Sequence, residues 1–148
     1  DDLLTLTKLH AGSALILMQA FVPFMKDHGF GRVIFNSSRA SVGLETRSAY
    51  SYSKAGIIGM ARTWALELAP FGVTVNTVAP GPVLTDQFWG LVEKDSAQQI
   101  KIAASLPVRR IGKPEDVARA ILFFSDPENS YVTGQTLYVC GGSSIASG

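Results

Sequence analysis

The chain has 148 residues, 47% of them hydrophobic and 17% charged, a balance typical of one globular domain with an apolar core. Its net charge is +1, and its basic residues are dispersed apart from Arg109, Arg110 and Lys113, which argues against a nucleic-acid-binding surface. The only cysteine, Cys140, excludes an internal disulfide and a cysteine metal cluster. With no signal-peptide pattern and no run of roughly 20 apolar residues, we expect a cytoplasmic protein without a metal or a membrane span.

The predicted elements alternate between helices and single strands. Apolar residues recur at three- and four-residue spacing over 3–26, which predicts a helix whose last turn is bent or loosened by Pro23. The short apolar run GRVIFN (31–36) is typical of a buried parallel strand, and a polar loop then leads to a second long helix over 48–68.

The second half of the chain continues this alternation. VTVNTVAP (73–80) predicts another buried strand, which the Pro80-Gly81-Pro82 turn ends. Residues 86–106 predict an excursion of one or two short helices, and 114–125 predict a helix with a proline at an early position. A turn-rich stretch leads to the last predicted strand, QTLYVC (135–140).

This order predicts the α/β class, because single strands separated by helices pair in parallel through crossover connections. A doubly wound domain normally begins with the strand that feeds the phosphate-binding turn, whereas this series begins with a helix. We therefore expect the C-terminal part of a doubly wound parallel sheet, with about three strands and long crossover helices. No repeat or linker divides the chain, so 1–148 is interpreted as a single, partial domain.

Tyr50 and Lys54 are four residues apart on a predicted helix, which places them on one face, about 5–6 Å apart at their Cβ atoms. A phenol has a pKa of about 10, too high for a good base near neutral pH, and a neighbouring ammonium lowers that pKa. The pair is therefore a candidate general acid/base. Taken alone, a Tyr and a Lys at this spacing more often form a solvated helix face. Tyr52 competes with Tyr50, but it lies on another face and has no Lys four positions on.

A serine near the end of the first predicted strand is the next candidate. Ser37 lies at the edge of the sheet where parallel α/β proteins bind ligands. Its hydroxyl can hydrogen-bond a substrate carbonyl while Tyr50 transfers the proton. The alternative is a capping role in a turn or helix, which suits Ser38 or Ser41 equally well.

The turn after the second predicted strand is a further candidate. Two prolines around Gly81 fix an extended segment with an exposed backbone, and Thr85 adds a hydroxyl. Such a segment can present N–H and C=O groups to an amide-bearing ring. The alternative is a purely structural strand-to-helix turn. Taken by itself, the proline-glycine motif favours this structural interpretation.

Together these segments resemble the short-chain dehydrogenase/reductase family, of the kind that includes the 3-oxoacyl-acyl-carrier-protein reductases. GRVIFNSS is similar to the family's strand that ends in the catalytic serine. The family's YxxxK helix, next strand and proline-glycine turn resemble AYSYSKAGIIGMARTWALELAPFGVTVNTVAPGPVLT. Its C-terminal helix and strand resemble RRIGKPEDVARAILFFSDPENSYVTGQTLYVCGG. The resemblance covers nearly the whole chain, corresponds to the C-terminal half to two-thirds of the family, and implies a Rossmann-like fold.

The resemblance implies a role for each candidate residue. Tyr50 is the acid/base at the reacting oxygen, Lys54 assists it and binds the nicotinamide ribose hydroxyls, and Ser37, thirteen positions before Tyr50, orients the substrate oxygen. The implied reaction is reversible hydride transfer between NAD or NADP and a small-molecule ketone or secondary alcohol. Besides Tyr50 and Lys54, the implied cofactor site comprises the segment after the second strand, namely Pro80, Gly81, Val83 and Thr85.

Three features depart from the family pattern. The family's relay asparagine falls on His10, with Ser13 at the glycine position, so His10 either takes part in catalysis by holding a relay water or packs as an ordinary helix histidine. Cys140 replaces the usual aspartate before the last two glycines. The chain has no GxxxGxG segment to bind the pyrophosphate, so the 148 residues alone are expected to be inactive.

The resemblance also implies self-association through the apolar helices 3–26 and 48–68, which predicts a homodimer or homotetramer. A truncated module that only oligomerises is the alternative to an enzyme. Phe88, Trp89 and Leu91 fall where the family's substrate lid begins and either suggest an apolar or ring-bearing substrate or merely cover the core. If the substrate is carried by an acyl carrier protein, the candidate basic contacts are Arg39, Arg47, Arg109 and Arg110.

Overall fold

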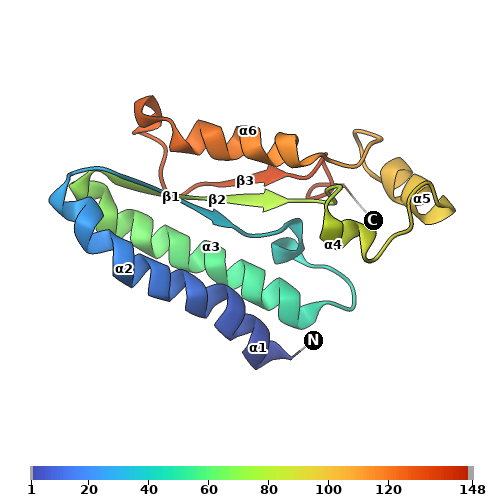
Figure 1. The fold of residues 1–148 in the computed structure, drawn as a ribbon, viewed down its shortest axis with the longest axis horizontal. Coiled ribbons are helices and arrows are strands. Elements are labelled where there is room, and N and C mark those ends of the chain that lie inside the picture. Colours follow the sequence, from blue (N-terminus) through green and yellow to red (C-terminus); the bar gives the residue numbers. More distant parts are fainter. Residues whose placement is uncertain (1, 147–148) are drawn as a thin grey trace.

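The computed structural model describes residues 2–146, and its centre is one sheet of three parallel strands: β1 (Gly31–Asn36), β2 (Val73–Pro80) and β3 (Thr136–Val139). The strand order places β2 in the middle, with β1 and β3 as the two outer strands (Figure 1). β1 pairs along its whole length with residues 73–78 of β2, and β3 pairs with residues 77–80. The predicted α/β class with parallel strands is confirmed.

The central strand is buried on both faces, which explains why its sequence is a nearly continuous apolar run. Val73, Val75 and Val78 are all fully buried, and so is Asn76. The Asn76 side chain donates to the carbonyl of Val132 at 2.8 Å and accepts from the N–H of Gln135 at 3.0 Å. This buried amide therefore ties the middle of β2 to the segment that precedes β3.

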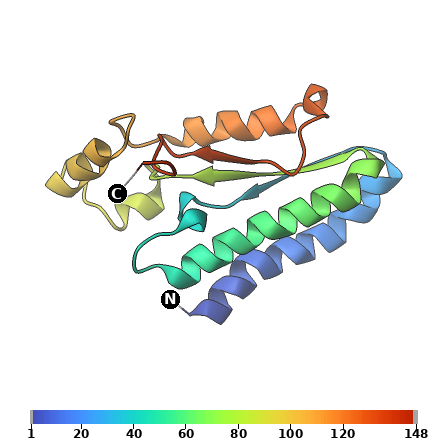
Figure 2. The same cartoon turned by 180° about the vertical axis from the view of Figure 1, so that it is seen from behind.

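Helices cover both faces of the sheet. One face carries α1 (Leu3–Thr7), a π-helical turn (Lys8–Gly12), α2 (Ser13–Asp27) and α3 (Ser48–Leu68), whereas α6 (Pro114–Ser125) lies on the other face (Figures 1 and 2). The helix predicted over 3–26 is thus divided by the π-helical turn. Pro23 lies inside α2, which continues for one further turn beyond it.

Two apolar clusters join these layers. On the side of α2 and α3, Met18 and Ala65 pack with Val75 of β2. On the side of α6, Phe124 packs with Val78 of β2. Because the two clusters lie on opposite faces of the same strand, they fix the position of β2 and of the segment that follows it.

Between β2 and α6 the chain leaves the sheet in an excursion that contains α4 (Asp86–Trp89) and α5 (Ala97–Ser105), in agreement with the prediction for 86–106 (Figure 1). Short 3-10 turns occur at Arg39–Val42, Ala69–Phe71 and Pro127–Asn129. Within residues 2–146, no helix combines the length and the apolar character that crossing a membrane requires.

Candidate active site

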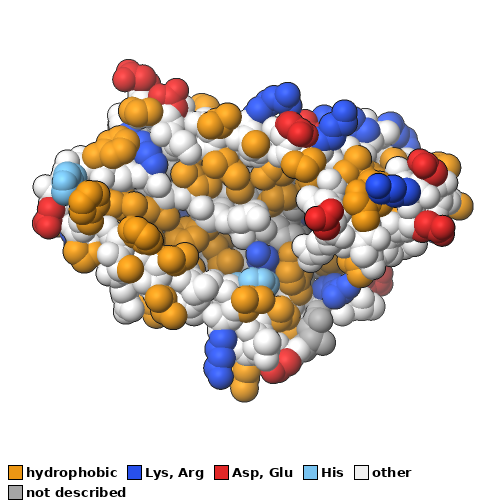
Figure 3. Space-filling model, in the orientation of Figure 1, with side chains coloured by type: hydrophobic (Ala, Val, Ile, Leu, Met, Phe, Trp, Pro, Cys, Tyr) orange, Lys and Arg blue, Asp and Glu red, His pale blue; other side chains and the backbone are white. Residues whose placement is uncertain are grey.

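A cleft of about 500 Å³ opens at the carboxyl ends of β1 and β2. It is lined by the segments that follow these two strands, by the start of α3, by α4 and by one side of α6. Figure 3 shows a cationic side chain and a histidine next to each other in a hollow near the middle of this face. Seven of the eight predicted site residues line the cleft, namely Ser37, Tyr50, Lys54, Pro80, Gly81, Val83 and Thr85.

Tyr50 and Lys54 lie in the first two turns of α3 and both border the cleft. The ammonium nitrogen of Lys54 is 5.8 Å from the centroid of the Tyr50 ring and donates to the carbonyl of Asn36 at 3.1 Å. Lys54 is only 9% exposed, and burial lowers the pKa of its ammonium. The end of β1 thus holds a largely buried cation near the Tyr50 ring, on the same side of α3, as the spacing of the two residues predicts.

The two serines after β1 are held differently. Ser37 is 3% exposed, and its hydroxyl donates to the backbone carbonyl of Lys54 at 2.7 Å. Ser38 accepts from the N–H of Ala40 at 3.1 Å and begins the 3-10 turn, which is the capping role that the sequence allowed for it. The hydroxyl proton of Ser37 is therefore engaged within the protein, whereas the hydrogen bond of Ser38 uses only a lone pair. Ser38 consequently keeps a proton for a group in the cleft.

His10 lies in the π-helical turn and reaches the same part of α3. Its Nδ1 is 2.9 Å from the hydroxyl of Ser53, and its ring stands edge-on to that of Tyr50, with 5.9 Å between centroids. Partial burial and, second, the charge of Lys54 lower the pKa of His10 from its ordinary value of 6.5. His10 is therefore a neighbour of the Tyr50–Lys54 pair, although it does not line the cleft itself.

The turn after β2 is held by backbone contacts. Gly81 donates to the carbonyl of Val139 at 3.0 Å, and a Cβ on Gly81 would lie 2.8 Å from the Cα of Cys140. Val83 forms a parallel bridge with Gly112, and Thr85 accepts from the N–H of Phe88 at 3.3 Å to begin α4. Only a glycine fits beside Cys140, so the course of the chain from Pro80 into the cleft is closely defined.

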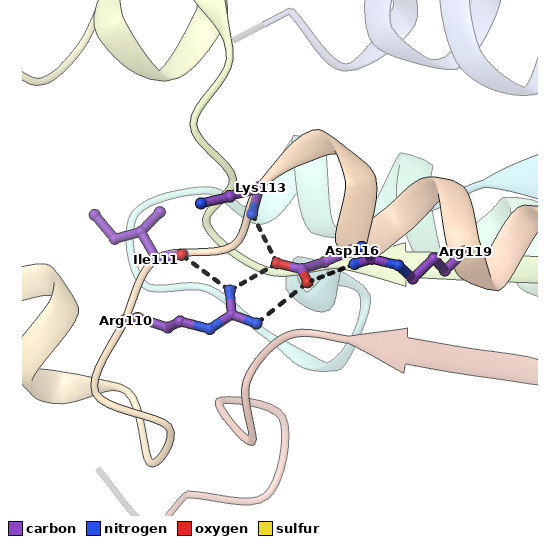
Figure 4. A network of polar contacts seen from close by, with 5 residues as sticks. All are labelled: Arg110, Ile111, Lys113, Asp116 and Arg119. Atoms are coloured by element: carbon purple, nitrogen blue, oxygen red, sulfur yellow. Dashed lines mark hydrogen bonds and ion pairs between the residues drawn. The ribbon is translucent and has the colours of Figure 1, made fainter.

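A charged network holds the start of α6 (Figure 4). Both terminal nitrogens of Arg110 donate to the carboxylate of Asp116, at 2.6 and 3.2 Å, and the N–H of Lys113 donates to it at 2.9 Å. These hydrogen bonds, with Arg110 first, lower the pKa of Asp116 to about 2. Because the network spans residues 110–116, it fixes Gly112, which bridges to Val83 in the turn after β2.

This network was not predicted from the sequence. Arg110 was a candidate contact for an acyl carrier protein, but its guanidinium fork is occupied by Asp116. The sequence did contain one signal for it. Asp116 is an acidic residue in the first turn of the helix, three positions after Lys113, which is a common arrangement at helix starts.

Comparison with known proteins gives the family of the chain. The family model described as enoyl-(acyl carrier protein) reductase matches residues 1–144. Two subunits of (2S)-[(R)-hydroxy(phenyl)methyl]succinyl-CoA dehydrogenase from Thauera aromatica, BbsD and BbsC, are each 42% identical to the chain, over 130 and 127 residues. The 3-oxoacyl-[acyl-carrier-protein] reductase FabG of Thermotoga maritima is 42% identical over 125 residues. These alignments cover 84–88% of the chain but only 49–51% of the relatives, so the chain spans about half the length of the curated relatives that it matches.

Solved structures agree with this assignment. A short chain oxidoreductase from Pseudomonas aeruginosa PAO1, described as NADPH-bound and as containing an atypical catalytic center, superposes with a TM-score of 0.87 at 32% identity, over 98% of this chain and 58% of that one. The acetoin dehydrogenase YohF of Salmonella typhimurium superposes with a TM-score of 0.84 at 27% identity, over 98% of this chain and 56% of that one. The chain therefore belongs to the short-chain dehydrogenase/reductase family, as its sequence predicted.

Proposed function

We propose that the chain is the proton-transfer part of an NAD- or NADP-dependent oxidoreductase that interconverts a ketone and a secondary alcohol. The observation that carries this proposal is the meeting of Tyr50, Lys54 and Ser38 around one cleft at the carboxyl ends of β1 and β2. Ligands bind at this edge of parallel α/β sheets. The relatives named as dehydrogenases and reductases support the same class of reaction.

In the proposed mechanism, Tyr50 transfers a proton to or from the reacting oxygen of the substrate. The Lys54 ammonium stabilises the negative charge that forms on the phenol oxygen. Ser38 donates its free hydroxyl proton to the substrate oxygen, a role that the resemblance implied for Ser37. Ser37 instead holds the backbone of Lys54, and thereby positions the ammonium.

The residues around the cleft fit the nicotinamide end of the cofactor. Lys54 gives one hydrogen bond to Asn36 and has further N–H groups for the ribose hydroxyls. The defined segment from Pro80 and Gly81 to Val83 and Thr85 offers backbone groups and a hydroxyl to the carboxamide. When bound, the cofactor supplies or accepts a hydride. Because the sequence has no glycine-rich phosphate-binding segment, we propose that 1–148 is a partial domain that does not turn over alone.

The proposed substrate is an acyl chain attached through a thioester. The printed names of the relatives from Thauera aromatica and Thermotoga maritima refer to a CoA ester and to an acyl carrier protein. The cleft has apolar side chains on the side of α4 and α6, namely Phe88, Leu91, Val117 and Ile121, and these suit a hydrocarbon chain.

The test is the turnover of a full-length protein that contains this segment, with NADH or NADPH and a 3-oxoacyl thioester. Tyr50→Phe is expected to lower kcat by about 10²–10⁴-fold, because it removes the acid/base. Tyr52→Phe is the matched control, since Tyr52 is two positions away on α3 and 60% exposed. Ser38→Ala is expected to lower kcat, more than Ser37→Ala does. Full activity of Tyr50→Phe would overturn the proposal.

A homodimer or homotetramer is the proposed assembly, because α2 presents an apolar face that nothing in the described chain covers. Its large exposed side chains include Ile16, Leu17, Phe21 and Phe24, which are 55–66% exposed. The same face supports the second candidate function, a module that only oligomerises. Calorimetry with NADH and NADPH on the full-length protein separates the two, since measurable binding favours the enzyme.

A further inference from the structure

We infer that His10 exchanges the proton of Tyr50 with solvent, and that Ser53 holds the His10 ring in the tautomer with hydrogen on Nδ1. This inference rests on the proposed role of Tyr50 as the acid/base. His10, in the π-helical turn, is then a proton carrier, and the buried Ser53 is the residue that positions its ring.

The tautomer follows from counting protons around Ser53. The hydroxyl of Ser53 is 2.9 Å from the backbone carbonyl of Tyr50 and 2.9 Å from Nδ1 of His10. A hydroxyl has a single proton and a carbonyl can only accept, so the proton of Ser53 points to the carbonyl. The hydroxyl oxygen must then accept, and Nδ1 must donate. Ser53 is 2% exposed, so water does not compete for this arrangement.

The other ring nitrogen is therefore the proton acceptor. With hydrogen on Nδ1, Nε2 carries the lone pair, and no residue within 2–146 gives it a hydrogen bond. The groups on α3 that face the ring are the phenol of Tyr50 and the ammonium of Lys54. Burial and, second, the charge of Lys54 lower the pKa of His10 below its ordinary value of 6.5, so the His10 ring is neutral near pH 7.

Alcohol oxidation releases a proton that has to reach solvent. During alcohol oxidation, the Tyr50 phenolate takes the hydroxyl proton of the substrate, and a bound cofactor would accept the hydride. The phenol then returns to phenolate by passing its proton through water to Nε2 of His10, and the imidazolium releases it to solvent. The two rings are edge-on neighbours with 5.9 Å between their centroids, so the proposed path from the phenol to the imidazole is short. Ketone reduction runs the same path in reverse.

This path predicts the sign of a pH effect. Only neutral His10 can accept a proton, so the path works above the pKa of His10 and fails as the pH falls through it. Burial and Lys54 lower that pKa from 6.5, so alcohol oxidation is expected to decline on the acidic side of pH 6.5. Removing the imidazole is expected to abolish this decline on the acidic side of the pH profile and to slow alcohol oxidation at neutral pH.

The tautomer is tested by nitrogen-15 NMR of the histidine rings above pH 7. His28 is an internal reference, because its Nδ1 lies 2.8 Å from the carbonyl of Phe24 and must carry the hydrogen. His10 is expected to give the same ring pattern as His28, with protonated Nδ1 and unprotonated Nε2. Ser53→Ala is expected to change the pattern of His10 and to leave that of His28 unchanged, which also reports that the fold is kept. A wild-type His10 protonated on Nε2 would overturn the inference.

The role in proton exchange is tested by alcohol oxidation with NAD⁺ and NADP⁺ in the full-length protein. His10→Ala is expected to lower kcat by about 10²-fold at neutral pH with little change in KM, and added imidazole is expected to restore part of it. His28→Ala, at the residue that follows α2, is the matched control. A His10→Ala enzyme with the wild-type rate and pH profile, beside an inactive Tyr50→Phe enzyme, overturns this inference and leaves the proposed function intact. Full activity in both variants overturns both.

Discussion

Gly29 and Gly72 lie close together just before β1 and β2, and alanine substitutions at them separate a steric clash from backbone strain. Gly29 and Gly72 both have a positive φ, 63° and 73°. A Cβ on Gly72 would lie 2.2 Å from the carbonyl oxygen of Gly29, which is a backbone atom and cannot rotate away. A Cβ on Gly29 would meet nothing within 4 Å. Gly72→Ala and Gly29→Ala therefore share the backbone strain and differ in the clash.

The magnitudes follow from these two contributions. Left-handed backbone strain alone is expected to cost Gly29→Ala about 1 kcal/mol of unfolding free energy. The clash at Gly72 pushes two turns apart and adds about 1–3 kcal/mol, for a total of about 3 kcal/mol. In a chain of this length that total lowers Tm by about 6–12 °C, against about 2–4 °C for Gly29→Ala.

Urea unfolding measures both variants, followed by the fluorescence of Trp64 and Trp89 and by circular dichroism. Trp64 packs against Phe35 of β1, so its emission reports on the sheet layer next to these turns. Equal losses in the two variants would refute the steric reasoning, because backbone strain would then account for the whole effect.

Three further substitutions test other contacts. Asp116→Asn is expected to lower Tm more than the neighbouring Glu115→Gln. Because pairing lowers the pKa of Asp116 to about 2, melting curves should show the wild-type advantage above pH 3.8 and its loss as the pH falls through about 2. Asn76→Ala leaves two backbone groups without partners and should cost about 1–3 kcal/mol in urea unfolding, whereas the exposed Gln98→Ala should stay within about 0.5 kcal/mol. Phe21→Glu charges the apolar face of α2 and should reduce the mass measured by light scattering to that of a monomer, and a monomeric wild-type protein would contradict the proposed interface.

Much of the fold could be predicted from local patterns. The run 73–80 contains Asn76, yet it reads as a buried strand, and the structure satisfies that amide with two backbone partners instead of exposing it. The helix of 48–68 was predicted with its bounds, because Pro70 and Gly72 end it. The π-helical turn at Lys8–Gly12 was not predicted, since the apolar spacing over 3–26 is compatible with one regular helix.

The candidate site could be predicted where helical spacing determines it. Tyr50 and Lys54 share one face of α3 because they are one turn apart, and the structure places them accordingly. The choice between Ser37 and Ser38 depends instead on the path of the loop after β1. Both serines line the cleft, and a count from Tyr50 does not decide which of them keeps a free hydroxyl proton for a ligand. The pairing of Arg110 with Asp116 likewise depends on the conformation of the turn between them, which cannot be predicted from the sequence.

The outer position of β1 affects how the chain behaves when it is handled alone. β1 gives hydrogen bonds to β2 on one side, and no strand among residues 2–146 pairs with its other side. Its sequence, GRVIFN, contains the β-branched residues Val33 and Ile34 and a single charge, Arg32, and none of its six residues is a proline or an acidic residue. An outer strand of this kind invites the addition of a foreign strand, which is the route to edge-to-edge aggregation. The chain thus has two surfaces open to association, the apolar face of α2 and the free edge of β1, and only the contact proposed for α2 would close into an assembly with a defined number of subunits.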